Sequence, residues 1–219
     1  MYDNWFFLVY TRETEAGGRM EQINNTKCYV DYTVTDFCTE VGRPELPSPT
    51  GGAVIGVVGA LLASLTVLIT RVSEKHSSPP DKESWSGFAE EAWELHRKLL
   101  RFAEEDIQDT ASIMSGEGPA CVRKQVAAPA KIASALVKLL RLVEGVSGRV
   151  HQSVRSDVLA IAHLGRGAAD AIFEIEKNDI EWGGGGDATL LARIEEWRIQ
   201  AHEAAGRILH KVRENEWQK

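Results

Sequence analysis

The stretch with the clearest potential for chemistry is an acidic run that contains Asp106. Carboxylates occupy positions 104, 105, 106 and 109, and Asp106 stands between the apolar residues Phe102 and Ile107. Burial raises the pKa of a carboxyl group, and a carboxyl group that titrates near neutrality can donate or accept a proton during catalysis. Asp106 is therefore the candidate proton-transfer residue; the alternative is an ordinary solvated helix face.

Two further places in the sequence favour an anionic ligand. Gly51 and Gly52 begin a long apolar run, and the free N–H groups at the start of a helix attract negative charge. Lys124 follows Arg123 at another expected helix start, where the helix dipole does not favour a cation. Either an anionic ligand or a surface ion pair with a carboxylate such as Glu117 explains these two cations.

The sequence contains no convincing metal site. An HExxH motif begins at His202, but Gly206 occupies the position of the second ligand. The cysteines Cys28, Cys38 and Cys121 are odd in number and form no CxxC pair. This cysteine usage is typical of a reducing compartment and predicts structural thiols without zinc.

The elements that must position these residues are all expected to be helices. Apolar residues recur at helical spacing in most of the chain, and no segment alternates as a strand does. The expected helices cover residues 33–40, 52–72, 85–115, 119–147, 150–179 and 187 onward. Pro129 predicts a kink or break in one of them. The sequence thus predicts an all-α bundle of about five long helices around an apolar central helix.

The apolar central segment, which begins at Gly51, has three interpretations. Its twenty uncharged residues are long enough to cross a membrane, and Gly52 and Gly56 form a GxxxG pair. A phosphate-binding loop is disfavoured, because the required lysine is missing. A buried helix explains more of the pattern, because Gly52, Gly56, Ala60 and Ser64 form one stripe that another helix can approach closely.

The charge and the N-terminal sequence argue against two classes of protein, those that mainly bind nucleic acid and those that carry a signal peptide. The formal net charge of −7 argues against a protein whose main partner is nucleic acid, since phosphate contacts need clustered Lys and Arg. The N-terminal run WFFLVY is too short for a signal peptide and lacks a basic region before it. We therefore expect a cytoplasmic protein with a poorly ordered extension over residues 1–30, which contains a second candidate start at Met20, and a helical domain over 31–219.

Four motifs occur in the order and spacing of a known family. They are PSPTGGAVIGVVGALLASL at 47–65, AEEDIQDTASIM at 103–114, QVAAPAKIA at 125–133 and RSDVLAIAHLGRGAADA at 155–171. Together they resemble the cyclodeaminase/cyclohydrolase family, which comprises the C-terminal domain of formiminotransferase-cyclodeaminase and the stand-alone methenyltetrahydrofolate cyclohydrolases. The resemblance runs from about residue 33 to residue 179.

The resemblance implies folate one-carbon chemistry in an all-α homodimer with no cofactor beyond the tetrahydrofolate substrate. One reaction converts 5-formiminotetrahydrofolate to 5,10-methenyltetrahydrofolate and ammonia, and the other hydrates the methenyl compound to 10-formyltetrahydrofolate. Asp106 matches the family's aspartate and would transfer the proton. The residues implied at the substrate are Gly51, Gly52, Lys124, Ser156 and Asp157. Asp157 would accept N–H groups from the pterin edge, whereas a helix N-cap is the alternative role for Ser156.

Several positions depart from the family pattern. Ala53 and Val54 replace the end of its glycine–serine motif, and Ala171 and Ile175 stand where asparagines are usual. These changes remove polar groups near the expected substrate. Two alternatives to an enzyme therefore remain: a catalytically silent helical scaffold or binding dimer of the same fold, and a single-span membrane protein.

Overall fold

The computed structural model describes residues 28–114, 127–182 and 188–214 of the 219-residue chain. These ranges contain six α-helices and two short 3-10 helices, and no strand. The α-helices are α2 (Val34–Val41), α3 (Gly51–Lys75), α4 (Pro79–Met114), α6 (Ala127–Val146), α7 (Arg155–Trp182) and α8 (Ala188–Glu214), and the 3-10 helices are η1 (Tyr29–Asp31) and η2 (Gln152–Val154). The predicted all-α class is confirmed.

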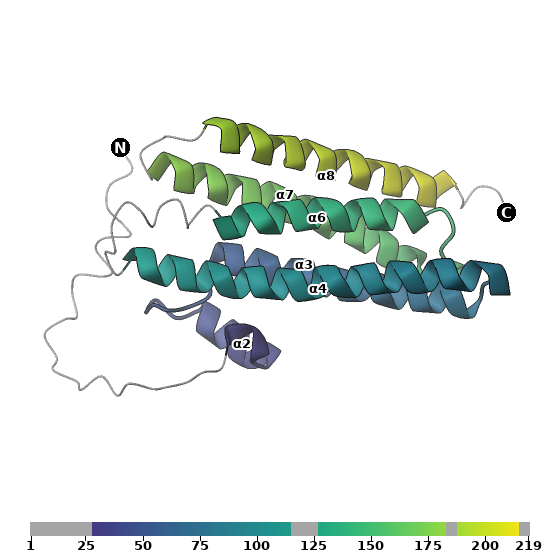
Figure 1. Cartoon of the computed structure of the whole chain (residues 1–219), viewed down its shortest axis with the longest axis horizontal. Coiled ribbons are helices and arrows are strands. Elements are labelled where there is room, and N and C mark those ends of the chain that lie inside the picture. Colours follow the sequence, from purple (N-terminus) through teal and green to yellow (C-terminus); the bar gives the residue numbers. More distant parts are fainter. Residues whose placement is uncertain (1–27, 115–126, 183–187, 215–219) are drawn as a thin grey trace, which may run out of the picture.

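The five long helices lie side by side along the long axis of the molecule, and the short α2 lies beside one end of the bundle (Figure 1). At this end, on the left of Figure 1, α3, α6 and α8 begin and α4 and α7 end. Helix α3 packs mainly on α4, and also on α7 and α6, while α8 covers α6 and α7. The residues at five helix ends are therefore brought close together, although they are far apart in the sequence.

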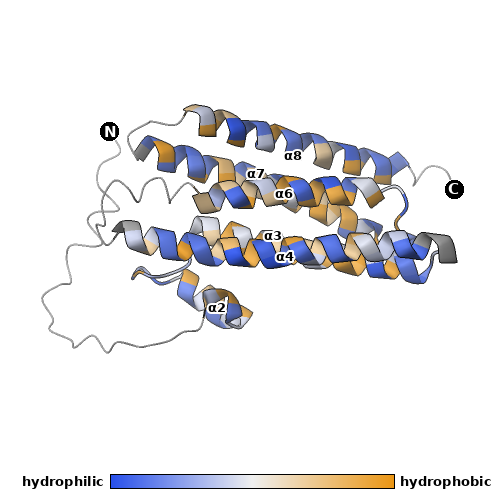
Figure 2. Ribbon diagram, in the orientation of Figure 1, coloured by the Kyte–Doolittle hydropathy of each residue, from blue (hydrophilic) through white to orange (hydrophobic). Residues whose placement is uncertain are grey.

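Helix α6 supplies the middle of the core because it packs on α3, α4, α7 and α8. Its large apolar side chains at Ile132, Leu136, Leu139 and Leu140 are completely or almost completely buried. Their spacing of three and four residues places them along the faces that meet neighbouring helices. The hydrophobic faces of the long helices turn inward and the charged faces outward (Figure 2).

The small-residue stripe of α3 packs within the chain. A Cβ atom on Gly56 would lie 2.9 Å from the Cβ atom of Ala103 on α4. The neighbouring Gly59, which is not part of the stripe, is similarly close packed, because a Cβ atom there would lie 3.1 Å from side-chain atoms of Leu99 and Leu136. Glycine therefore lets α3 approach α4 closely. The close contacts that the sequence predicted for this stripe are made inside one chain.

Helix α3 is nevertheless not surrounded on all sides, as a central helix would be. Leu61 and Leu68 on its outer face are 60% and 49% exposed. Within the described ranges, α3 is the one helix whose length and hydropathy would allow it to cross a membrane, and 61% of its most apolar 18 residues are buried. A core helix of a soluble protein can have the same length and composition, so this property alone is not evidence that α3 crosses a membrane.

Two predicted helix boundaries differ from the structure. Helix α4 begins at Pro79 rather than near Trp85, so the polar linker shrinks to residues 76–78; proline is well suited to the first turn of a helix. Pro129 lies in the first turn of α6, which continues unbroken to Val146. The predicted kink or break is therefore absent from the described part of this helix.

Candidate functional site

Asp106 lies on α4 at the end of the bundle where α3 begins, and its side chain is only 5% exposed. The Thr50 hydroxyl donates a hydrogen bond of 3.0 Å to Oδ2 of Asp106. A Cβ atom on Gly52 would lie 2.7 Å from the Asp106 carboxyl carbon, so only glycine lets the helix start approach this closely. The structure thus brings the predicted residues Gly52 and Asp106 into direct contact.

The surroundings of Asp106 raise the pKa of its carboxyl group. Burial raises the pKa of Asp106 to about 6, while hydrogen bonds from the Thr50 hydroxyl and the Ala53 backbone N–H limit the rise by favouring the charged form. The nearby charge of Asp109 raises the pKa further. The carboxyl group therefore exchanges its proton close to neutral pH, as an acid–base group in catalysis must.

Two more carboxyl groups, on α7, are electrostatically coupled to Asp106. Burial raises the pKa of Glu176 to about 8, and the charges of Asp179 and Asp106 contribute to this rise. Burial, followed by the charge of Asp106, raises the pKa of Asp179 to about 6. No described Lys, Arg or His forms an ion pair with any of the three. The end of the bundle therefore carries an acidic cluster of Asp106, Glu176 and Asp179.

Glu176 is the most deeply buried member of the acidic cluster. Its side chain is 0% exposed, and neither carboxyl oxygen has a hydrogen-bond partner of standard geometry among the described residues. The backbone N–H of Ala130, in α6, favours the ionised form of Glu176, but this effect is smaller than the effect of burial. A buried carboxyl group without partners is strongly disfavoured as an anion, so Glu176 keeps its proton at neutral pH.

Sequence reasoning missed Glu176 and Asp179, although the sequence carries a signal for Glu176. Ile172 and Ile180 are buried four residues before and after Glu176 on the same face of α7. An acid in the middle of an apolar helical stripe is exceptional, because charged residues are almost never fully buried without a partner.

The remaining predicted residues lie in other places. Gly51 begins α3 beside α7, where a Cβ atom would lie 2.9 Å from Cδ1 of Ile175. Ser156 and Asp157 lie in the first turn of α7, at the opposite end of the bundle. Nineteen residues separate Asp157 from Glu176, which is about 28 Å along a helix. One chain therefore does not bring Ser156 and Asp157 to the acidic cluster, and Lys124 lies outside the described residues.

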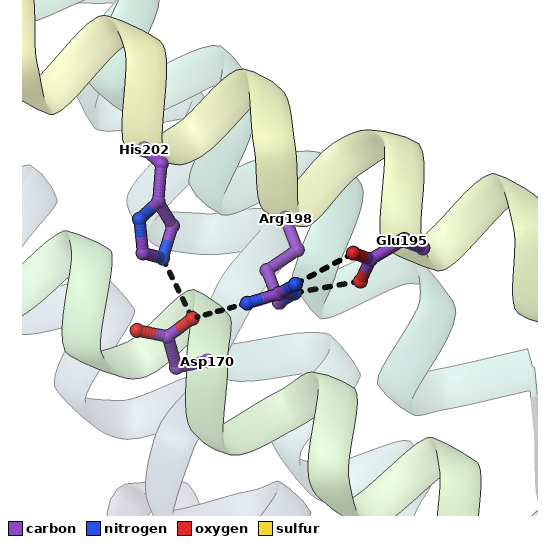
Figure 3. Close-up of polar contacts among 4 residues, drawn as sticks. All are labelled: Asp170, Glu195, Arg198 and His202. Atoms are coloured by element: carbon purple, nitrogen blue, oxygen red, sulfur yellow. Dashed lines mark hydrogen bonds and ion pairs between the residues drawn. The ribbon is translucent and has the colours of Figure 1, made fainter.

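A second polar constellation joins α7 to α8 (Figure 3). Nε2 of His202 lies 2.7 Å from Oδ1 of Asp170, and the Arg198 guanidinium donates to both Glu195 and Asp170. The four side chains are 33–42% exposed, so the ion pairs add little stability. His202 is thus engaged with Asp170, and within the described ranges no group of His, Cys, Asp or Glu has an arrangement suited to a metal ion.

Comparisons with known proteins place these features in a family. A family model described as formiminotransferase-cyclodeaminase matches residues 33–179. No curated protein matches the sequence. The fold is similar to the crystal structure of formiminotetrahydrofolate cyclodeaminase from Thermotoga maritima, with a TM-score of 0.74 and 21% sequence identity over 85% of this chain and 98% of that one.

Proposed function

The chain belongs to the formiminotransferase-cyclodeaminase family, and we propose that it is a folate one-carbon enzyme, a formiminotetrahydrofolate cyclodeaminase or a methenyltetrahydrofolate cyclohydrolase. The observation that carries this proposal is the buried Asp106 carboxyl group, which is held against the start of α3 and has a pKa of about 6. It lies on the family's acidic-helix motif, beside the family's glycine motif.

The formimino group is protonated at neutral pH, so its nitrogen already carries two hydrogens. The cyclodeaminase reaction then needs one proton to move from N10 to that nitrogen. Ionised Asp106 accepts the proton of the N10 amine as N10 attacks the formimino carbon and forms the new C–N bond. The same carboxyl group then returns the proton to the formimino nitrogen, the bond between that nitrogen and carbon breaks, and ammonia leaves. A carboxyl group with a pKa near 6 serves both steps at neutral pH.

The cyclohydrolase reaction uses the same group as a base. Asp106 accepts a proton from water as the water oxygen attacks the methenyl carbon. It then passes this proton to N5, the bond between N5 and that carbon breaks, and the remaining hydroxyl proton is released to solvent as the 10-formyl compound forms. The geometry on α4 suits both reactions equally, because each needs an ionised carboxylate next to the reacting carbon. The two activities differ in their substrates and in whether the ring closes with release of ammonia or opens with uptake of water, and the assay below distinguishes them.

The direct test is turnover by the purified chain in the absence of detergent. Added 5,10-methenyltetrahydrofolate loses its near-ultraviolet band faster than in buffer if the chain is a cyclohydrolase. The band appears from 5-formiminotetrahydrofolate if the chain is a cyclodeaminase. Folded protein that does neither would contradict the proposal and favour the binding dimer. The apolar side chain of Ile175, which belongs to α7 and lies beside Gly51 at the start of α3, is consistent with that alternative.

We further propose that the chain is a soluble, cytoplasmic homodimer paired through the outer face of α3. Val58, Leu61, Leu65, Leu68 and Val72 follow each other at steps of three and four, the spacing of a coiled-coil seam. A two-fold axis between Leu61 and Leu68 would run the two α3 helices antiparallel and bury both leucines.

Charge and site geometry favour this second copy as the occupant of the α3 face. Arg71 and Lys75 are exposed near the end of α3 and form no ion pair with a described residue, whereas the acidic cluster lies at the start of α3. Antiparallel pairing brings the basic end of one copy to the acidic end of the other. It also brings Asp157 of the second copy toward Asp106, because the backbone N–H of His151, shortly before α7, donates to Ser73 at the end of α3.

Mixing two inactive variants tests this shared site. Asp106→Asn and Asp157→Asn chains are each expected to be inactive as pure dimers. After co-refolding, half of the dimers are hybrids with one intact site, so about a quarter of the wild-type activity should return. Absence of any recovery from folded, dimeric mixtures would show that Asp106 and Asp157 do not act across subunits.

A further inference from the structure

A groove next to the acidic cluster combines three lysines with two aromatic rings. It lies between α4, α6 and α8 and has a volume of about 340 Å³. Its polar and aromatic lining consists of Lys98 and Phe102 on α4, Lys131, Ser134 and Lys138 on α6, and Trp197 on α8. A cavity of this size and lining is typical of a site for part of a small molecule.

The groove is locally basic on an acidic protein. Lys98 and Lys131 pair with Glu94 and Glu105 at its rim, at 3.1 and 2.8 Å, but these pairs are exposed and therefore weak. Lys138 forms no ion pair with a described residue. Because Lys131 and Lys138 lie two helical turns apart on one face of α6, they present two positive charges along the groove.

The aromatic rings add a surface for a flat ligand. Phe102 and Trp197 come from helices on opposite sides of α6, and both line the groove while packing against the core. The Lys131 ammonium lies 5.7 Å from the centre of the Phe102 ring, so charge and aromatic surface adjoin each other. This combination suits a ligand in which an aromatic ring carries a negative group.

The groove adjoins the acidic cluster at Ala130. Ala130 lines the groove, and its backbone N–H acts on Glu176. Glu105, which pairs with Lys131, precedes Asp106 on α4. A ligand whose reacting part lies at Asp106 would therefore extend directly past Ala130 into the groove.

We propose that this groove binds the aryl-carboxylate part of the substrate, with the ring between Phe102 and Trp197 and the carboxylates at Lys98, Lys131 and Lys138. This assignment rests on the proposed function, because the aminobenzoyl-glutamate portion of a folate is such a group. The groove then fixes the orientation of the substrate, while the acidic cluster carries out proton transfer.

Binding of a fragment that cannot react tests the groove separately from catalysis. Calorimetric titration of p-aminobenzoyl-glutamate into wild-type protein should give binding that weakens as salt is added. Lys138→Glu should raise the dissociation constant about tenfold or more, and Phe102→Leu should raise it several-fold. The matched control is Lys82→Glu, a charge reversal at an exposed lysine that lies about 24 Å along α4 from Lys98, and it should leave the affinity unchanged.

The outcomes separate this inference from the proposed function. Equal fragment affinity in wild-type, Lys138→Glu and Phe102→Leu proteins that remain folded overturns the groove assignment, even if folate substrates are turned over. Fragment binding that Lys138→Glu abolishes supports the assignment, even if no folate is converted. The absence of folate conversion would then count against the proposed activity alone.

Discussion

Asp106→Asn is expected to reduce turnover of the folate substrate at least about 100-fold, the usual contribution of a positioned proton-transfer group. Asparagine has nearly the same shape and can still accept a hydrogen bond from the Thr50 hydroxyl, but it cannot take up or release a proton. In the wild-type protein, kcat/KM should fall as the pH drops below about 6, because the active form of Asp106 is ionised. Steady-state assays across pH 5–9 measure both effects.

The matched control for this variant is Glu91→Gln, which removes an exposed carboxylate from the same helix. It should leave the rate and its pH dependence unchanged. Circular dichroism and gel filtration establish that both variants are folded. An Asp106→Asn protein that retains more than a tenth of the wild-type rate would mean that another group transfers the proton.

Glu176→Gln is expected to remove most of a pH-dependent loss of stability. The folded-state pKa of Glu176 is raised from 4.5 to about 8, so the folded protein holds a proton that the unfolded chain has released above pH 4.5. Wild-type stability therefore decreases as the pH rises from about 4.5 to 8 and then levels off, and this residue contributes up to about 5 kcal/mol to the decrease. Glutamine has no proton to lose and should flatten this slope.

Urea unfolding at pH 5, 7 and 8.5 measures the slope directly. The matched control is Glu174→Gln, which changes an exposed glutamate two residues earlier on α7 and should keep the wild-type slope. The diagnostic quantity is the pH dependence, because a buried amide without partners also destabilises the protein at every pH. A wild-type slope in Glu176→Gln would place the proton on Asp106 or Asp179 instead.

The presence of Glu176, a buried acid that destabilises the fold, indicates that this end of the bundle has a functional role. Replacing a buried, unpartnered acid by an apolar side chain of similar size usually stabilises a protein. Asp106, Glu176 and Asp179 all have raised pKa values at one end of the bundle, where burial acts together with mutual repulsion. Groups shifted in this way concentrate at functional sites, which is why we place the chemistry here.

The sequence was sufficient to predict the helical class and to single out Asp106, which the structure shows to be buried. Helical spacing of apolar residues identified all five long helices, and an acid between Phe102 and Ile107 identified Asp106. Gly52 and Asp106 were each predicted as site residues through the family motifs, and the structure shows that they lie in contact although they belong to different helices.

The rest depended on how helices meet in three dimensions. Ser156 and Asp157 were grouped with Asp106, but α7 is long and they begin it, whereas Glu176 and Asp179 near its end reach the site. Which end of a helix lies beside Asp106 follows from its direction relative to α3 and α4. The groove also could not be predicted from the sequence, because side chains from α4, α6 and α8 form it together.

The most direct test of the folate assignment is the amount of ammonia released from 5-formiminotetrahydrofolate, measured alongside formation of the methenyl compound. A cyclodeaminase centred on Asp106 releases one ammonia for each methenyl product with wild-type protein, and neither product above background with Asp106→Asn. Should the chain act as a cyclohydrolase, it would release no ammonia but would convert the methenyl compound in the same preparation. Dimeric wild-type protein that releases no ammonia and also leaves the methenyl compound unchanged would contradict the account.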